Sequence, residues 1–290
     1  MSRRTSLAVL WAAYLWTIAV AWAAGSFLPI ESPLVMGLVI DLLATLMIFV
    51  FSVIFDNSSV YDPYWSVAPI FLAGYWSWSA WGHSGGHLRA VMVVVLVALW
   101  GVRLTANFLT HWQGMRHEDW RYEDFRGRAG SAYWVVSFFG FHLVPTLVVF
   151  AACVPVYVAC TSSNRLGGLD VLAAAVTLTA IAVETVADRQ MRAAVAGGNL
   201  GDRTFRGGLW SVSRHPNYLG EIGFWWGIYL FALAADPGRW WTVFGPLAVT
   251  ILFLTVSLPL IEERMRARRV DYETVSREVP LLIPRFSRKG

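Results

Sequence analysis

The sequence predicts an all-α, polytopic helical membrane protein with about seven to eight transmembrane helices, and three observations support this class. Of its 290 residues, 57% are hydrophobic and only 14% are charged, whereas charged residues make up about a quarter of an ordinary soluble domain. The apolar residues occur in long runs, and a helix needs about 20 such residues to cross a hydrocarbon core of about 30 Å. Lys and Arg gather in alternate connecting segments, the distribution that the positive-inside rule describes.

Eight candidate spans follow from the apolar runs. The third is short and rich in Trp and Ser, which is also typical of a tilted or partly interfacial segment. The fifth contains Pro145 and Pro155, which lack a backbone donor and are therefore expected to kink the helix. The spans lie at about residues 7–24, 34–55, 65–82, 88–110, 134–160, 167–187, 216–235 and 240–260.

The basic residues also predict the orientation. With a cytoplasmic N-terminus, only Arg89, Arg165 and Arg239 fall in segments on the opposite side, and Arg103 lies within a span. The other basic residues fall on the cytoplasmic side, so both termini are expected there. The long, charged loops lie on that side too, which places the active site of this multi-pass protein at the cytoplasmic face.

Several classes of protein are excluded. The net charge of +4 comes without a basic stripe on a soluble face, so no nucleic-acid partner is expected. Cys153 and Cys160 are seven residues apart on one span, about 10 Å along a helix, which is too far for a disulfide. No metal-ligand spacing, GxGxxG or P-loop is present, which argues against a metal site or a soluble nucleotide fold. The sequence carries no indication of the oligomeric state.

The motif RHPNYLGE marks the start of the seventh span and is the strongest candidate site. Pro216 suits the first position of a helix, because its missing N–H would be unpaired there anyway. Asn217, Glu221 and Trp225 follow at spacings of four and share one helix face, with Tyr218 beside them. A carboxylate, an amide and a phenol are costly to bury in a membrane without a function.

Other polar side chains collect at the inner ends of four spans, which random placement does not explain. Glu221 is the hardest to assign to structure alone, because a carboxylate among aromatic residues needs a donor. The group as a whole comprises Arg103, Glu184, Asp188, Arg192, Asn217, Tyr218, Glu221, Glu262 and Glu263.

Structural roles compete with functional ones at several of these positions. Asp188 and Arg192, four residues apart, can form a simple helix-end ion pair of little energetic value. Arg103 can extend its guanidinium to the headgroups, and His215 can cap the following helix. The run EDWRYEDFR at 118–126 is also typical of a solvated interfacial loop with an aromatic belt.

Four segments together resemble a known family. EDWRY at 118–122, ETVADRQ at 184–190, GLWSVSRHPNYLGE at 208–221 and PLIEERM at 259–265 are similar to the DUF1295 proteins, which belong with the steroid 5-alpha-reductase C-terminal domain superfamily. The similarity extends over about residues 60–285. The core RHPxYxG is also similar to isoprenylcysteine carboxyl methyltransferases.

The resemblance implies a multi-span enzyme that uses NADPH to reduce a C=C bond conjugated to a ketone. It implies one domain over 1–290, with residues 1–110 on the substrate side and 111–290 as the cofactor-binding half. His215 and Pro216 would shape the cofactor contact, and the tail from Arg266 to Tyr272 would close over the adenine. The full cofactor-binding set is Arg103, Arg116, Trp120, Arg121, Asp188, Arg192, Arg214, His215, Pro216, Asn217, Tyr218, Glu221, Trp225, Arg266 and Tyr272.

The acid that polarises the ketone is less clearly marked. The steroid reductases use a tyrosine and a glutamate from the N-terminal half, but the position matched to that tyrosine, three before Arg103, is Trp100. An indole cannot donate a comparable proton. Tyr122 and Asp62 are favoured as catalytic residues over the other candidates, Tyr61 and Tyr64.

The leading interpretation is therefore an integral-membrane, NADPH-dependent reductase of a steroid-like or isoprenoid-like enone that enters from the bilayer. One alternative is a membrane methyltransferase that uses S-adenosylmethionine; the Arg-rich inner segments favour NADPH, which carries phosphates. A second alternative is a lipid-binding or transport protein, although the internal repeats common in transporters are not visible.

Overall fold

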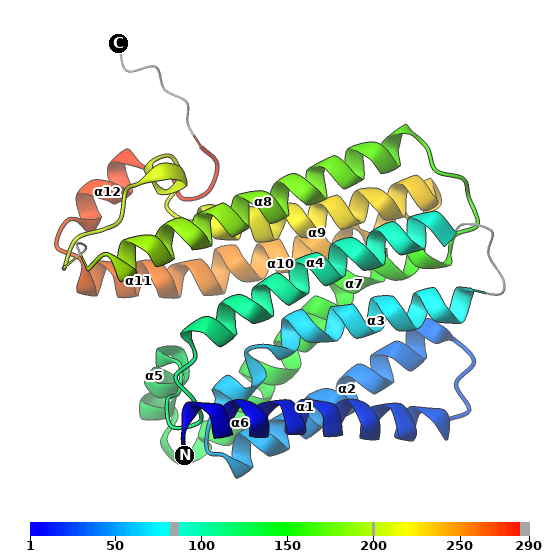
Figure 1. The fold of residues 1–290 in the computed structure, drawn as a ribbon, viewed down its shortest axis with the longest axis horizontal. Helices are drawn as coiled ribbons and strands as arrows, with labels where there is room; N and C mark the ends of the chain where they lie inside the picture. The colour runs from blue at the N-terminus through cyan, green and yellow to red at the C-terminus, as the bar shows by residue number, and fades with distance from the viewer. Residues whose placement is uncertain (82–86, 199–200, 285–290) are drawn as a thin grey trace. The chain divides into compact units, whose positions relative to one another are not determined.

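A computed structural model describes residues 1–81, 87–198 and 201–284, which are helical or irregular and contain no β-strand (Figure 1). Within these residues, seven helices are long and apolar enough to cross a membrane. The predicted class, a polytopic helical membrane protein, is confirmed. The chain forms two compact units, Met1–Arg165 and Leu166–Gly290, and each is described by itself.

The first unit begins with two long helices joined by a short turn. Ser2 and Ser32 cap them through side-chain oxygens that accept from Thr5 N and Val35 N. The predicted third span is the short helix α3, whose 17 residues fall below the length of the seven candidate spans. The helices are α1 (Arg3–Ser26), α2 (Pro33–Ile54), η1 (Ser58–Tyr61), α3 (Tyr64–Ala80), α4 (His87–His111), α5 (Trp120–Ala129), η2 (Gly130–Ala132), α6 (Tyr133–Val136), η3 (Ser137–Leu143) and α7 (Val144–Thr161).

A solvated loop is one interpretation of residues 118–126, but the part from Trp120 onwards lies in helix α5. Asp119 caps α5 through a bond from Arg121 N to Asp119 Oδ1 of 3.0 Å. The cap fixes the start of α5 and turns Tyr122 into the unit, where only 4% of its surface is exposed.

The second unit is built on two long helices that lie side by side, α8 and α9 (Figure 1). Glycines on α9 make this close packing possible: a Cβ at Gly220 would lie 2.6 Å from the Cβ of Glu184, and one at Gly227 would lie 3.0 Å from the Cα of Thr177. Small residues at such contacts are typical of membrane helices. The helices are α8 (Gly168–Ala196), η4 (Gly208–Ser211), α9 (Pro216–Ala235), η5 (Pro237–Val243), α10 (Phe244–Leu252), η6 (Phe253–Ser257), α11 (Leu258–Arg268) and α12 (Tyr272–Glu278).

Two spans contain a π-helical segment, and each lies directly before a proline. The segments η3 and η6 end two residues before Pro145 and Pro259, respectively. Proline neither donates to nor fits against the carbonyl four residues earlier, and those carbonyls belong to Phe141 and Thr255, within the π segments. The wider π turn relieves that clash.

Candidate functional site

The carboxylate of Glu262 is the centre of a buried polar cluster in the second unit. Its side chain on α11 accepts hydrogen bonds from the Arg214 guanidinium and the Tyr272 hydroxyl. The His215 Nε2 atom lies 2.7 Å from Glu262 Oε1, so Nε2 carries the hydrogen when the carboxylate is ionised. His215 is thus bound to α11 and does not cap α9, which has no side-chain cap bond.

The chain after α12 covers the same motif. The backbone N–H groups of Arg214 and His215 donate to the carbonyls of Pro280 and Leu281 over 2.9 Å and 3.2 Å. The loop before α9 and the segment after α12 meet in this way (Figure 1). The RHP motif is therefore fixed on one side by Glu262 and on another by the tail.

Three polar atoms of this motif have no hydrogen-bond partner among the residues that the structure describes. They are the buried atoms Ser213 Oγ, Arg214 Nε and Asn217 Oδ1. Ser213 Oγ and Arg214 Nε can each donate a hydrogen bond, and Asn217 Oδ1 can accept one. Buried polar atoms are almost always hydrogen-bonded in native structures, so this set is suited to a polar ligand.

Glu221 lies further along the same helix. It is 3% exposed and accepts a hydrogen bond from Trp225 Nε1 over 3.1 Å. The shared face of these two residues, expected from their spacing of four, is therefore present.

Two further contacts tie the tail to the loop before α9. Thr204 donates to Asp271 Oδ1 from its N–H and its hydroxyl, over 2.8 Å and 2.7 Å. Burial raises the pKa of the Asp271 carboxyl, but these bonds lower it by more, so it lies below its ordinary value. Burial, and then the bond to Glu262, raise the pKa of the Tyr272 phenol, so Tyr272 remains a hydrogen-bond donor.

The first unit contains a second polar cluster, around Asp62. The Tyr122 hydroxyl donates to Asp62 Oδ1 over 2.6 Å, and Arg121 lies 3.4 Å from the same oxygen. Burial raises the pKa of the Asp62 carboxyl to about 6, despite the opposing effect of Arg121. The carboxyl therefore exchanges its proton close to neutral pH.

A polar cavity of 280 Å³ opens beside Asp62. Its wall also includes Asp119, Arg121 and Trp112. The indole Nε1 of Trp112 is buried and has no acceptor within the described part of the chain. An acid and a residue with a spare donor thus line the same space. The wall is completed by Ser59, Trp65, Ser66, Leu104, Asn107, Phe108, His111 and His117.

The other predicted residues lie on several different elements. Arg116 is exposed, Trp120 begins α5, Arg103 lies on α4, and Asp188 and Arg192 lie on α8. The structure brings Tyr122 and Asp62 into contact within the first unit. Their catalytic roles, and the cofactor roles of the larger set, stay predictions.

Arg266 lies 3.6 Å from Glu262 and 3.3 Å from Glu273. Trp100, which stands where the resemblance expects a tyrosine, is fully buried. The two remaining acid candidates are bound elsewhere: Tyr61 pairs with Thr146, and Tyr64 donates to Asp41.

The predicted catalytic and cofactor-binding sets include neither Glu262 nor Trp112. Glu262 is part of the PLIEERM segment, but two adjacent glutamates occur there, and only the fold shows which one is buried. Trp112 has no sequence signal among 16 tryptophans. Its donor becomes notable only once its surroundings are known.

The class defined by this fold is a helical membrane protein with buried polar clusters in both units. The chain belongs to the DUF1295 family of proteins of unknown function, whose model matches residues 48–279. A relative is the uncharacterized protein C594.04c of Schizosaccharomyces pombe, 26% identical over 247 residues that cover 77% of this chain and 71% of that protein. No solved structure matches the chain.

Proposed function

We propose that this protein is an integral-membrane reductase that uses NADPH to saturate the C=C bond of an apolar enone, with its active site on the cytoplasmic side. The observation that carries this proposal is the set of buried atoms on Ser213, Arg214 and Asn217 without a partner among the described residues. A membrane protein retains such atoms at a cost of about 1–3 kcal/mol each unless a ligand binds them.

The second unit offers groups that suit a nucleotide. The N-terminus of α9 begins at Pro216 without a side-chain cap, so its backbone donors are available to an anion. Arg214 supplies one charged group there, and Arg192, Arg206 and Arg266 belong to the same unit. Arg binds phosphate through forked hydrogen bonds. The residues present therefore fit a dinucleotide, which supplies a hydride when bound.

In the first unit, Asp62 is the proposed acid. Its carboxyl lines the polar cavity, whereas Tyr122 is buried behind it and donates to it. A protonated Asp62 can donate a hydrogen bond to the ketone oxygen. When hydride adds to the β carbon, the C=C electrons move to this oxygen, which takes the proton from Asp62; the enol so formed becomes the saturated ketone as a proton reaches the α carbon. Tyr122 holds the carboxyl in place for this transfer. A pKa of about 6 suits an acid that works near neutral pH.

The experiment uses the purified protein in lipid nanodiscs. NADPH is expected to raise the melting temperature more than NADH does, because only NADPH carries the additional phosphate. Asn217→Ala should weaken NADPH binding about tenfold, since it removes a buried acceptor. Ser211→Ala is the matched control, because that hydroxyl is exposed and bonds only to Gly208 O among the described residues.

Product analysis with NADPH and a panel of steroid and isoprenoid enones then tests the reaction. Loss of the C=C bond, with one deuterium transferred from labelled NADPH, is the expected result. Stabilisation by S-adenosylmethionine but not by NADPH would overturn the proposal in favour of a methyltransferase.

A further inference from the structure

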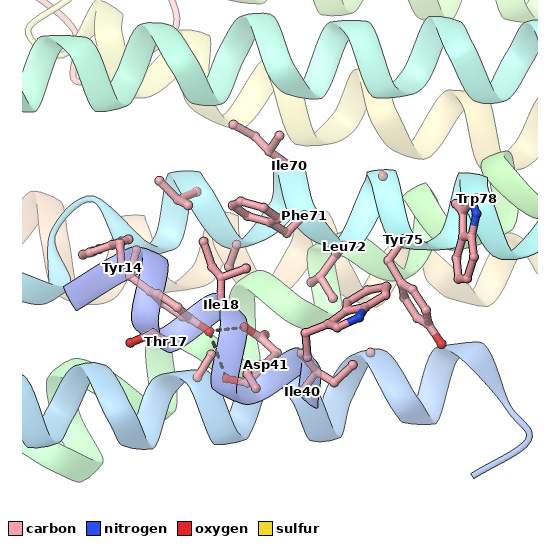
Figure 2. Close-up of a pocket in the computed structure, with 18 of the residues that line it drawn as sticks. Tyr14, Thr17, Ile18, Ile40, Asp41, Ile70, Phe71, Leu72, Tyr75 and Trp78 are labelled. Carbon is pink, nitrogen blue, oxygen red and sulfur yellow. Dashed lines mark hydrogen bonds between the residues drawn. The ribbon is translucent and has the colours of Figure 1, made fainter. Parts of the chain in front are cut away.

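A second, apolar cavity of 470 Å³ lies in the first unit among α1, α2 and α3 (Figure 2). It lies on the opposite face of α3 from the polar cavity: Tyr64 and Phe71 line the apolar one, while Trp65 and Ser66 line the polar one. Its volume is in the range of ligand pockets, about 300–1,000 Å³. The proposed reduction uses no residue of this apolar cavity.

Two polar side chains lie in the otherwise apolar wall of this cavity. Asp41, in the middle of α2, is 5% exposed, and its carboxyl accepts from the Tyr64 hydroxyl over 2.6 Å. Thr17, on α1, is 1% exposed, and its hydroxyl has no hydrogen-bond partner within the described residues. Figure 2 shows both side chains among those around the cavity. A carboxyl on a membrane span is costly unless it has a function.

The chemistry of these groups selects the ligand. The Tyr64 hydrogen is already used on Asp41, so Asp41 can accept from a ligand and Thr17 can donate to one. An alcohol hydroxyl both donates and accepts, and so satisfies both; a ketone or an ether can only accept. Among the residues that the structure describes, no Lys, Arg or His lines the cavity, so none of them would neutralise a phosphate headgroup there.

The rim of the cavity fits a ligand that arrives from the lipid. Trp22, Phe71 and Trp78 line it and are at least half exposed. Exposed aromatic side chains on membrane helices lie in the bilayer or at its interface. A lipid can therefore enter without crossing water.

We propose that the cavity among α1, α2 and α3 binds a membrane lipid alcohol, with its hydroxyl donating to Asp41 and accepting from Thr17. The site is distinct from the proposed reductase centre. Much of its wall, including Thr17 and Asp41, precedes residue 48 and lies outside the segment that matches the family.

The test measures binding of three isoprenoid probes to the full-length protein in nanodiscs by native mass spectrometry. Farnesol is expected to bind at least tenfold more tightly than its methyl ether, which cannot donate to Asp41. Thr17→Val should weaken both probes. Asp41→Asn supplies an amide donor, so it should weaken farnesol and remove most of its preference over the ether.

Thr255→Val is the matched control, because this threonine is exposed on η6 in the other unit. Ala21→Leu, at a 1% exposed position in the cavity wall, should reduce binding by filling the space. Melting temperatures show that each variant is folded. Equal affinity for farnesol and its ether, or wild-type binding by Thr17→Val, would overturn the proposal.

Farnesylamine is the third probe, since an amine would also pair with Asp41. If the amine binds more than tenfold more tightly than farnesol, the cavity is a site for a cationic lipid, and the proposal of a lipid alcohol is wrong. NADPH-dependent enone reduction is measured separately on the same samples. Its absence would count against the reductase but would leave the alcohol site standing.

Discussion

Asp62 and Glu262, one in each unit, are both buried carboxylates that accept a hydrogen bond from a tyrosine, but their surroundings differ. Glu262 receives hydrogen bonds on both oxygens, from two elements besides its own. Asp62 accepts on Oδ1 from Tyr122 over 2.6 Å and from Arg121 over 3.4 Å, and it lines a cavity. A carboxylate with donors on both oxygens joins the elements that supply those donors, whereas one that lines a cavity can exchange a proton.

The comparison predicts its largest effect at Asp62. Asp62→Asn should reduce enone reduction by about 10²–10⁴-fold, the usual contribution of a general acid, with little change in NADPH affinity. In the wild type, the rate should fall as pH rises above about 6, the pKa of this carboxyl, because the protonated form is lost. The measurement is the single-turnover rate between pH 5 and pH 8.

Asp56→Asn serves as the control for this change. Asp56 lies in the same connection, but its side chain is 76% exposed, so its loss should leave the rate nearly unchanged. A fully active Asp62→Asn variant would show that Asp62 is not the general acid, and the proposed difference in role between Asp62 and Glu262 would then be wrong.

The same substitution should stabilise the folded protein. Burial raises the pKa of Asp62 from 3.8 to about 6, so the folded chain holds a proton that the unfolded chain releases. Stability therefore falls as pH rises between these two values and then stays level. Asp62→Asn avoids the cost of the buried charge, by at most about 3 kcal/mol for a shift of roughly two units. Its melting temperature relative to wild type should rise from pH 4 to pH 7; a parallel pH dependence of the two proteins is the contrary result.

The membrane class and the contacts within one helix can be predicted from the sequence, but the contacts of these two clusters cannot. The apolar runs predict the membrane class, since burial in lipid leaves helices as the simple solution. The spacing of Glu221 and Trp225 predicts their contact, because both lie on one helix. No sequence spacing predicts the contact of Glu262 with His215, which is 47 residues away. The same holds for the contact of Tyr122 with Asp62, which is 60 residues away. These contacts depend on tertiary packing, which the local pattern does not contain.

Glu262→Gln should have the next largest effect. Gln keeps the size of the side chain but offers only one acceptor oxygen, so Arg214, His215 and Tyr272 compete for it. Because Arg214 and His215 flank the proposed nucleotide site, NADPH affinity should fall about tenfold, the worth of one hydrogen bond to a charged group. Isothermal titration calorimetry measures the NADPH affinity of the variant and of the wild type.

Glu263→Gln is the matched control for this prediction. Glu263 is the next residue on α11 and is exposed, so the same change in charge should leave the affinity close to that of wild type. Equal losses in the two variants would indicate a general electrostatic effect and not a tie at Glu262.

Asp271 extends the comparison to a smaller effect. Like Glu262, it joins two segments through its carboxylate, but it lies near the surface. The bonds from Thr204 keep its pKa below the ordinary value, so its contribution is present at neutral pH and is lost as pH falls below about 4. Asp271→Ala should release the loop around Thr204 and cost only a few tenths of a kcal/mol, since solvent screens the charge. Hydrogen exchange of the Thr204 amide should become about two- to fivefold faster at pH 7, and this difference from wild type should narrow as pH falls below about 4. Unchanged exchange at pH 7 would show that Arg206 and Glu278, paired at 2.5 Å, hold this loop without Asp271.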